Sequence, residues 1–318
     1  MPGEKEQIEI EKNPELMNIL NEVNQPHTAR KDLLMQWSNK NENRNVISYF
    51  GSFNLPGSMI DDRDRDVFEE ILSNMDTSKG LDLILNSPGG LPLAAERIIQ
   101  VCRAYSSDFR VVVPKMAKSA ATMIAFGANT ILLGETSELG PIDPQLAYKD
   151  QRGEYAVHSA YAIMRGVDDV LTKIQSLPVG ARPEGLLSLL PPIDQPFIEE
   201  CKIAQDLSKD IAIRYLKMTT FPNLKESISE CTQGEDCIEA KIVKFLNPEK
   251  TFSHGRPITF EEAQIIGLNV KLLKKEDPNW NLLLKIYSRT NFIVQNSGNI
   301  AKLIESPMHS FSASISPQ

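Results

Sequence analysis

Short apolar segments and amphipathic segments alternate along residues 45–134 of this 318-residue chain. The segment at 45–53 is rich in β-branched and aromatic residues and predicts a strand. Residues 61–76 follow with the apolar spacing of a helix. The pattern then repeats through LDLILN, LPLAAERIIQVCRAY, FRVVV, SAATMIAFGA and TILLG. Strands separated by single helices form parallel sheets with right-handed crossovers, so the alternation predicts an α/β fold built from βαβ units.

Segments of different composition flank this region. Residues 1–43 are polar and charged with weak helical patterns, which predicts a partly helical N-terminal extension. We expect a main domain over 44–275 and a C-terminal extension over 276–318 that is partly disordered at its end. A Pro- and Gly-rich insertion near 178–196 cannot continue a helix, and composition leaves open whether it is a linker or an ordered loop.

Composition excludes several classes of function. The chain has 34 Lys and Arg against 42 Asp and Glu, and a net charge of -8 argues against a nucleic-acid binder. The charged N-terminus lacks a signal-peptide core, and no apolar run reaches the length of a membrane span. Cys231 and Cys237 lack a second pair of ligands, so reduced thiols are favoured over a metal site. We therefore expect a cytoplasmic protein with no metal and no cofactor.

The sequence SPGG at 87–90 follows a predicted strand. Pro88 ends that strand, while Gly89 and Gly90 allow backbone angles that a Cβ would forbid. Exposed N–H groups after a strand can bind an anion, whether a phosphate or a developing oxyanion. The simpler interpretation is a tight turn between a strand and a helix.

A single serine, Ser119, stands among small residues in PKMAKSAATMIAFG. A P-loop requires a glycine where the chain has Ala117, and the esterase motif G-x-S-x-G fails at Ala117 and Ala121. The motif S-x-x-K fails as well, because Thr122 occupies the lysine position. The segment alone therefore leaves two interpretations: Ser119 caps a helix, or it is a nucleophile.

The order of these segments carries a specific resemblance. SPGG is followed about thirty residues later by Ser119, and GPIDPQ begins some twenty residues beyond it. The chain thereby resembles the Clp-protease/crotonase superfold and its signal-peptide-peptidase-like serine proteases. MAKSAAT and SELGPIDPQ are most similar to the serine dehydrogenase proteinases, and FEEAQIIGLNV at 260–270 resembles a late helix and strand of these proteases. The resemblance covers roughly 45–175 and 250–272. It implies a ClpP/crotonase-like spiral of βαβ units with added helices, and it makes 44–275 the protease domain.

By that resemblance the chain is a soluble serine endopeptidase with Ser119 as its nucleophile. The amides of Gly89 or Gly90, together with that of Ala120, would form the oxyanion hole. The start of the helix after Ser119 would stabilise negative charge there. The resemblance also implies a homo-oligomer that acts on peptides or unfolded proteins.

The general base is less well defined. Clp-type proteases place a histidine where this chain has Asp143, whereas signal-peptide-peptidase-like enzymes use a lysine that Lys173 matches in spacing. Three further residues stay open as a base or as ordinary surface groups: Lys118, Lys149 and His158. A base lysine must be buried enough to lose its proton, which the sequence does not reveal. We expect His254 to be structural.

Two other functions are compatible with the sequence. The fold could use its oxyanion hole on acyl-thioesters, as crotonases do, although no basic, adenine-sized pocket signature is present. A degenerate protease that binds peptides or scaffolds an assembly is favoured by the missing histidine. The retention of Ser119 and SPGG argues against degeneration.

Overall fold

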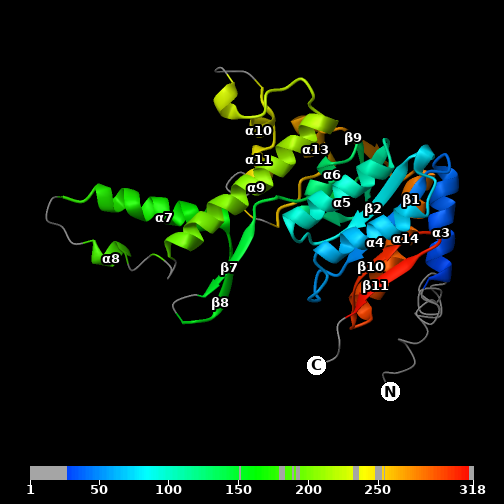
Figure 1. Ribbon diagram of the computed structural model, residues 1–318, viewed down its shortest axis with the longest axis horizontal. Helices are drawn as coiled ribbons and strands as arrows, with labels where there is room; N and C mark the ends of the chain where they lie inside the picture. The colour runs from blue at the N-terminus through cyan, green and yellow to red at the C-terminus, as the bar shows by residue number, and fades with distance from the viewer. Residues whose placement is uncertain are drawn as a thin grey trace.

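A seven-stranded sheet forms the body on the right of Figure 1. The structure is a computed structural model that describes residues 27–149, 152–178, 183–187, 190, 194–231, 236–247, 253 and 255–314. The strand order is β11-β10-β1-β2-β3-β5-β9. The strands are β1 (Asn45–Gly51), β2 (Leu81–Asn86), β3 (Phe109–Val113), β5 (Thr130–Gly134), β9 (Val270–Leu273), β10 (Ile300–Glu305) and β11 (Ser310–Ser314). Strands β1, β2, β3, β5 and β9 run parallel, and β10 and β11 add an antiparallel edge.

Helices cover both faces of the sheet. Successive parallel strands are joined by α4 (Asp62–Ser73), α5 (Pro92–Tyr105) and α6 (Ala120–Phe126). Their apolar sides form one core with strand residues such as Ile47 and Tyr49. The neighbouring residues Val46 and Phe50 belong to a second core, because consecutive strand side chains point to opposite faces. The predicted α/β class and the order of its strands and helices are confirmed.

Helix α3 near the start of the described chain, and the elements after residue 277, belong to this sheet domain. Helix α14 (Pro278–Asn296) packs against α3 (Thr28–Lys40), and β10 pairs with β1. Residue 275 is therefore no boundary within the sheet, since α14 and β10 bury apolar surface that the parallel strands expose. Strand β11 ends at Ser314, so the last residues of the predicted C-terminal extension, 315–318, lie outside the described residues, as do residues 1–26 of the predicted N-terminal extension.

A second part of the chain projects away from the sheet (Figure 1). It consists of the hairpin β7 (Gln145–Lys149) and β8 (Tyr155–Ser159), α7 (Ala160–Gln175), α8 (Glu184–Leu187) and the first half of α9 (Gln195–Thr219). We call this part the arm. Its own core is small and is centred on Ala160, Ile163 and Cys201. The described part of the Pro-rich insertion contains α8 and the start of α9, and thus lies within the arm.

Short elements complete the described chain: η1 (Thr77–Lys79), β4 (Met116–Ala117), β6 (Glu138–Leu139), η2 (Ile228–Glu230), α10 (Ile238–Lys241), α11 (Val243–Leu246) and α13 (Phe260–Ile266). The predicted late helix and strand are confirmed as α13 and β9. Among the described residues, no helix has both the length and the apolar character that crossing a bilayer requires.

Candidate active site

Ser119 stands between β4 and α6 in an unusual backbone conformation. Its φ of 49° and ψ of -119° lie outside the regions that L-residues ordinarily adopt. Such strain costs on the order of 1–3 kcal/mol and is concentrated at functional sites. The side chain is partly buried and makes no capping hydrogen bond to α6. Helix capping therefore does not account for this serine.

The SPGG turn is bonded to the strand that leads into Ser119. The amide of Ser87 donates to the Met116 carbonyl at 2.9 Å, and the Lys118 amide donates to the Ser87 carbonyl at 3.0 Å. Gly89 has a φ of +106°, and a Cβ on it would lie 2.7 Å from the Ser119 Cβ. The turn and the serine thus approach each other more closely than any other residue type would allow.

The other side of the turn is held by Ile60. The Ile60 amide donates to the Gly89 carbonyl at 2.8 Å, and the Leu91 amide donates to the Ile60 carbonyl at 2.9 Å. A Cβ on Gly90 would lie 2.3 Å from the Ile60 carbonyl oxygen, so only glycine fits there as well. The turn is clamped between the Ile60 backbone and Ser119.

The backbone amides of Gly89, Gly90 and Ala120 lie around the contact between the turn and Ser119, and they differ in their hydrogen-bond partners. The Gly89 amide donates to Ser87 Oγ at 3.2 Å. The amides of Gly90 and Ala120 donate to no acceptor within the described part of the chain. Ala120 begins α6, where backbone donors have no partner inside the helix. Gly90 and Ala120 can therefore offer N–H groups to an oxyanion, whereas Gly89 is already engaged.

A cavity of about 410 Å³ opens beside Ser119. The SPGG turn and the start of α5 form one wall, and α9 contributes Ala204, Leu207 and Ser208. Another wall consists of Ile142, Pro144, Gln145 and Leu146. Most of this lining is apolar, which is typical of a ligand site with a few polar groups.

Asp143 lies in the turn that follows β6. It is only 1% exposed, and its Oδ2 accepts a hydrogen bond from Gln145 Nε2 at 3.0 Å. The turn is tied to α6 by Thr122, whose Oγ1 lies 2.7 Å from the Ala117 carbonyl oxygen and accepts from the Gly140 amide at 3.0 Å. The sequence had marked Thr122 only as a mismatch to a motif.

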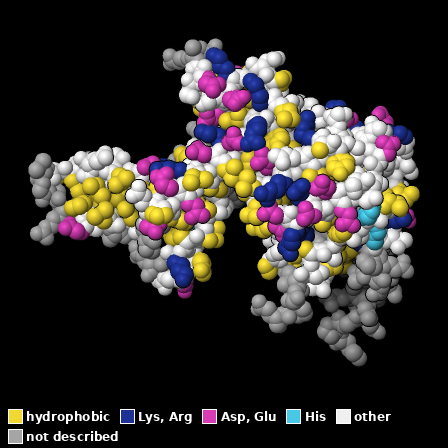
Figure 2. Space-filling view, viewed as in Figure 1, with side chains coloured by type: hydrophobic (Ala, Val, Ile, Leu, Met, Phe, Trp, Pro, Cys, Tyr) yellow, Lys and Arg dark blue, Asp and Glu magenta, His cyan; other side chains and the backbone are white. Residues whose placement is uncertain are grey.

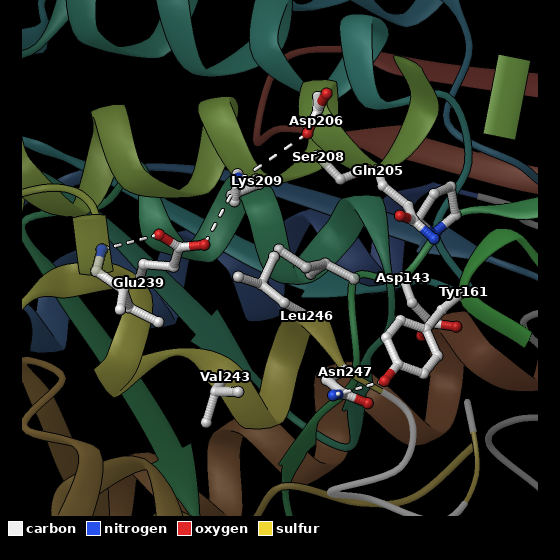
Figure 3. Close-up of a pocket in the computed structure, with 13 residues that line it drawn as sticks. Asp143, Tyr161, Gln205, Asp206, Ser208, Lys209, Glu239, Val243, Leu246 and Asn247 are labelled. Carbon is white, nitrogen blue, oxygen red and sulfur yellow. Dashed lines mark hydrogen bonds and ion pairs between the residues drawn. The ribbon is translucent and has the colours of Figure 1, made fainter. Parts of the chain in front are cut away.

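Asp143 lines a second cavity of about 220 Å³, shown in Figure 3. Ile142, Pro144 and Ser208 line both this cavity and the one beside Ser119, so the two adjoin. The structure thus brings Gly89, Gly90 and Ala120 to Ser119 and places Asp143 in the neighbouring cavity.

Lys173 is not brought to Ser119 within the chain. It is exposed near the far end of α7, and Figure 1 shows α7 well separated from α6. Lys149 and His158 also lie on the arm, where His158 is exposed and packs on the Tyr148 ring with centroids 5.6 Å apart.

Lys118 is turned toward other partners. Its Nζ forms an ion pair with Glu138 Oε1 at 2.5 Å and lies 3.4 Å from the Gly255 carbonyl oxygen. The segment before α13 therefore passes beside the residue that precedes Ser119. His254 adjoins this contact in sequence, but it lies outside the described residues. No spacing in the sequence pointed to the contact, because 137 residues separate its two ends.

A buried ionic cluster supports the segment that clamps SPGG. Lys302 Nζ contacts Asp64 Oδ1 at 2.6 Å, Asp61 Oδ2 at 3.2 Å and the Met59 carbonyl oxygen at 2.9 Å. Burial raises the pKa of the Asp64 carboxyl despite this ammonium. Burial also acts to raise the pKa of Asp61, but Arg63 and Lys302 outweigh it and hold that pKa at about 2.

The chain is similar in sequence to a known family and to two known proteins. The sequence profile of the ClpP-like SDH-type serine proteinase family matches residues 24–164. An uncharacterized protein of Methanocaldococcus jannaschii is 30% identical over 249 residues, which are 76% of this chain and 73% of the relative. A second uncharacterized protein of that organism is 24% identical over 218 residues, 69% of this chain but only 58% of the relative's length.

Two proteases are among the solved structures that match this chain. A mutant of a membrane-bound stomatin-specific protease is 20% identical and aligns with 42% of this chain and 65% of its own, with a TM-score of 0.27. A mutant of ClpP1 from Listeria monocytogenes is 12% identical and aligns with 77% of this chain and 98% of its own, with a TM-score of 0.38.

Proposed function

The chain belongs to the family of ClpP-like SDH-type serine proteinases, and on that premise we propose that it is a serine endopeptidase with Ser119 as its nucleophile. The observation that carries the proposal is the strained backbone of Ser119, whose hydroxyl caps no helix and borders an apolar cavity. A hydroxyl at a sharp turn between a strand and a helix is exposed to a substrate carbonyl, as in other serine hydrolases.

The reaction proceeds by acyl transfer. Ser119 Oγ attacks the carbonyl carbon of the scissile bond while a general base takes the hydroxyl proton. The negative charge that develops on the carbonyl oxygen is bound by the amides of Gly90 and Ala120, a term worth roughly 10²–10³ in rate per donor. The amine leaves with the proton, and water then hydrolyses the acyl-enzyme. Gly89 offers no N–H group to the oxyanion, because its amide already donates to Ser87 Oγ. Its role is to let the turn approach Ser119, since it has no Cβ.

The candidates for the general base are Lys173, Asp143 and His254, although the sequence favoured a structural role for His254. Lys173 is exposed on the arm, so it can reach Ser119 only from a neighbouring copy of the chain. Asp143 is buried in the adjoining cavity. His254 adjoins Gly255, whose carbonyl accepts from Lys118, the residue before Ser119.

The arm also supports assembly of the chain into a homo-oligomer. Figure 2 shows hydrophobic side chains gathered on the arm, where a small core leaves them unburied. The exposed ones on the arm include Tyr155, Val157, Leu171, Leu187 and Ile203. Apolar surface of this kind marks protein–protein contacts. A cytoplasmic location stays a prediction from the sequence.

A fluorophosphonate probe tests the nucleophile. We expect the probe to label Ser119 in the wild-type protein, with the adduct mapped by mass spectrometry, and no label in Ser119→Ala. Among Lys173→Met, Asp143→Asn and His254→Asn, the variant that removes the base should lose about 10²–10⁴ in labelling rate. Lys275→Met, at an exposed site, is the matched control.

Absence of labelling, while a known serine protease labels in parallel, would contradict the proposal. The chain would then act as a peptide-binding or scaffolding protein on a protease fold. The exposed position of Lys173 favours this second function, as does the missing histidine.

A further inference from the structure

The cavity that holds Asp143 has two polar groups that the fold leaves unpaired. Gln205 Nε2 and Ser208 Oγ are buried and have no hydrogen-bond partner in the described part of the chain. Both belong to α9, one helical turn apart, so they point to the same side of that helix. Ser208 is only 1% exposed. Buried polar groups are nearly always paired, so two neighbouring exceptions that line one cavity point to a ligand.

The other walls of this cavity are already engaged or apolar. Lys209 Nζ lies 3.4 Å from Glu239 Oε1 and 3.9 Å from Asp206 Oδ1. Glu239 Oε2 also accepts from the Ile228 amide at 3.1 Å. Figure 3 shows Lys209 facing Glu239 on one side, Asp143 and Gln205 on the other, and the Leu246 side chain between them.

The cavity adjoins the larger one beside Ser119. Its volume of about 220 Å³ is half that of the cavity beside Ser119, and Ser208 lines both. A peptide bound along the larger cavity can therefore extend one side chain past Ser208 into the smaller one.

The polar groups that line the cavity determine which kind of side-chain end can bind there. Gln205 Nε2 needs an acceptor, and the Ser208 hydroxyl can donate or accept. A carboxylate would face the carboxylates of Asp143, Asp206 and Glu239. An ammonium would be attracted by these three carboxylates, but it has no acceptor for Gln205 Nε2 and would lie near the ammonium of Lys209. An aliphatic end would leave both unpaired groups on α9 without partners.

A carboxamide meets each of these conditions. Its oxygen accepts from Gln205 Nε2 and the Ser208 hydroxyl, and its NH₂ group donates to the Asp143 carboxylate. We propose that the cavity lined by Asp143, Gln205 and Ser208 is a specificity subsite that binds a glutamine side chain of the substrate. The proposal rests on the proposed peptidase function, because a peptidase binds the peptide whose side chain would enter this subsite.

Binding to the inactive full-length protein tests the subsite without turnover. Fluorescein-labelled hexapeptides carry Gln, Leu, Glu or Lys at one of four central positions, and fluorescence anisotropy gives the Kd for Ser119→Ala protein. At one position we expect the Gln peptide to bind about 5- to 30-fold more tightly than the Leu peptide, as one or two added hydrogen bonds imply.

Two variants in the Ser119→Ala background test whether the preference for the Gln peptide arises at Gln205 and Ser208. Gln205→Leu and Ser208→Ala should each reduce the Gln-over-Leu ratio to about twofold or less, with the Kd of the Leu peptide unchanged. Gln175→Leu, an exposed glutamine at the end of α7, should leave the ratio as it is.

Three results would overturn the subsite. They are equal affinity for Gln and Leu at every position, tighter binding of the Glu or Lys peptide, or a Gln preference that survives both variants. If the probe labels Ser119 without any Gln preference, the subsite fails and the peptidase stands. If the preference is present without labelling, the peptidase fails and the pocket stands as a peptide-binding site.

Discussion

Gly89 lies in direct contact with Ser119, although thirty residues separate them in the chain. A Cβ on Gly89 would come within 2.7 Å of both the Ser119 Cβ and the Lys118 carbonyl oxygen. Side chains do not tolerate such distances, so the SPGG turn can sit beside the serine only with glycine at this position. The shape of the candidate active site depends on this one missing side chain.

Gly89→Ala should therefore disable the site. We expect the rate of fluorophosphonate labelling at Ser119 to fall at least about 100-fold, because the displaced turn moves the Gly90 amide. The free energy of unfolding should fall by about 1–3 kcal/mol, since alanine is strained at a φ of +106°. Gly166→Ala in α7, where no atom lies within 4 Å, is the control and should be neutral or stabilising. Normal labelling of Gly89→Ala would refute the inferred geometry.

Thr122→Val removes a hydroxyl and keeps the shape of the side chain. The Gly140 amide then loses its acceptor in a buried place, which should lower the free energy of unfolding by about 1–3 kcal/mol. Because Thr122 joins α6 to the turn of Asp143, we also expect labelling to slow about tenfold. Urea denaturation and the probe assay measure both effects. Thr172→Val, at an exposed site on α7, should change neither, and equal behaviour of the two variants would contradict this role.

Lys302→Met leaves two carboxylates near each other without their shared ammonium. Removing one partner of a buried ion pair costs about 3–5 kcal/mol in the free energy of unfolding, and urea denaturation measures it. Lys275→Met breaks an exposed pair with Glu276 and should stay within about 0.5 kcal/mol of the wild type. A loss below about 1 kcal/mol for Lys302→Met would show that the cluster contributes little.

We expect the Asp61 carboxyl to make the free energy of unfolding depend on pH in the acid range. Its pKa in the folded protein is about 2, below the 3.8 of an unperturbed aspartate. The ionised carboxylate thus contributes stability that is present above pH 4 and is lost as the pH falls toward 2. Urea denaturation between pH 5 and 2.5 should give a shallower decline for Asp61→Asn than for the wild type. The exposed Asp169→Asn should follow the wild type, and parallel curves for Asp61→Asn would exclude the linkage.

The central part of the fold could be predicted because its signals are local. The apolar spacing of 61–76 corresponds to α4, and the β-branched segment at 45–53 corresponds to β1. Each pattern arises from residues that are neighbours in the chain, where periodicity separates helix from strand. The division at residue 275 was drawn from local composition, whereas β10 pairs with β1 about 255 residues away and no local pattern encodes that pairing.

Near Ser119, too, some features could be predicted from the local sequence, whereas others depend on packing. Glycines at 89 and 90 and small residues around Ser119 mark a close backbone approach, which residue size alone indicates. The burial of Asp143, the exposure of Lys173 and the contact of Lys118 with Gly255 depend on where α7 and the segment before α13 pack. Spacing along the chain suggested Lys173 as the base, but it contains no information on the direction in which the arm projects.

By itself, the sequence determined the alternation of strands and helices, the glycine turn after β2 and the serine at the start of α6. These features follow from backbone preferences and side-chain volume within a few neighbouring residues. Only the tertiary structure decided that β10 and β11 complete the sheet, that Lys302 supports the clamp on SPGG, and that Gln205 and Ser208 are left unpaired beside Asp143. Burial and pairing between distant segments arise when the elements pack, so they are properties of the folded chain as a whole.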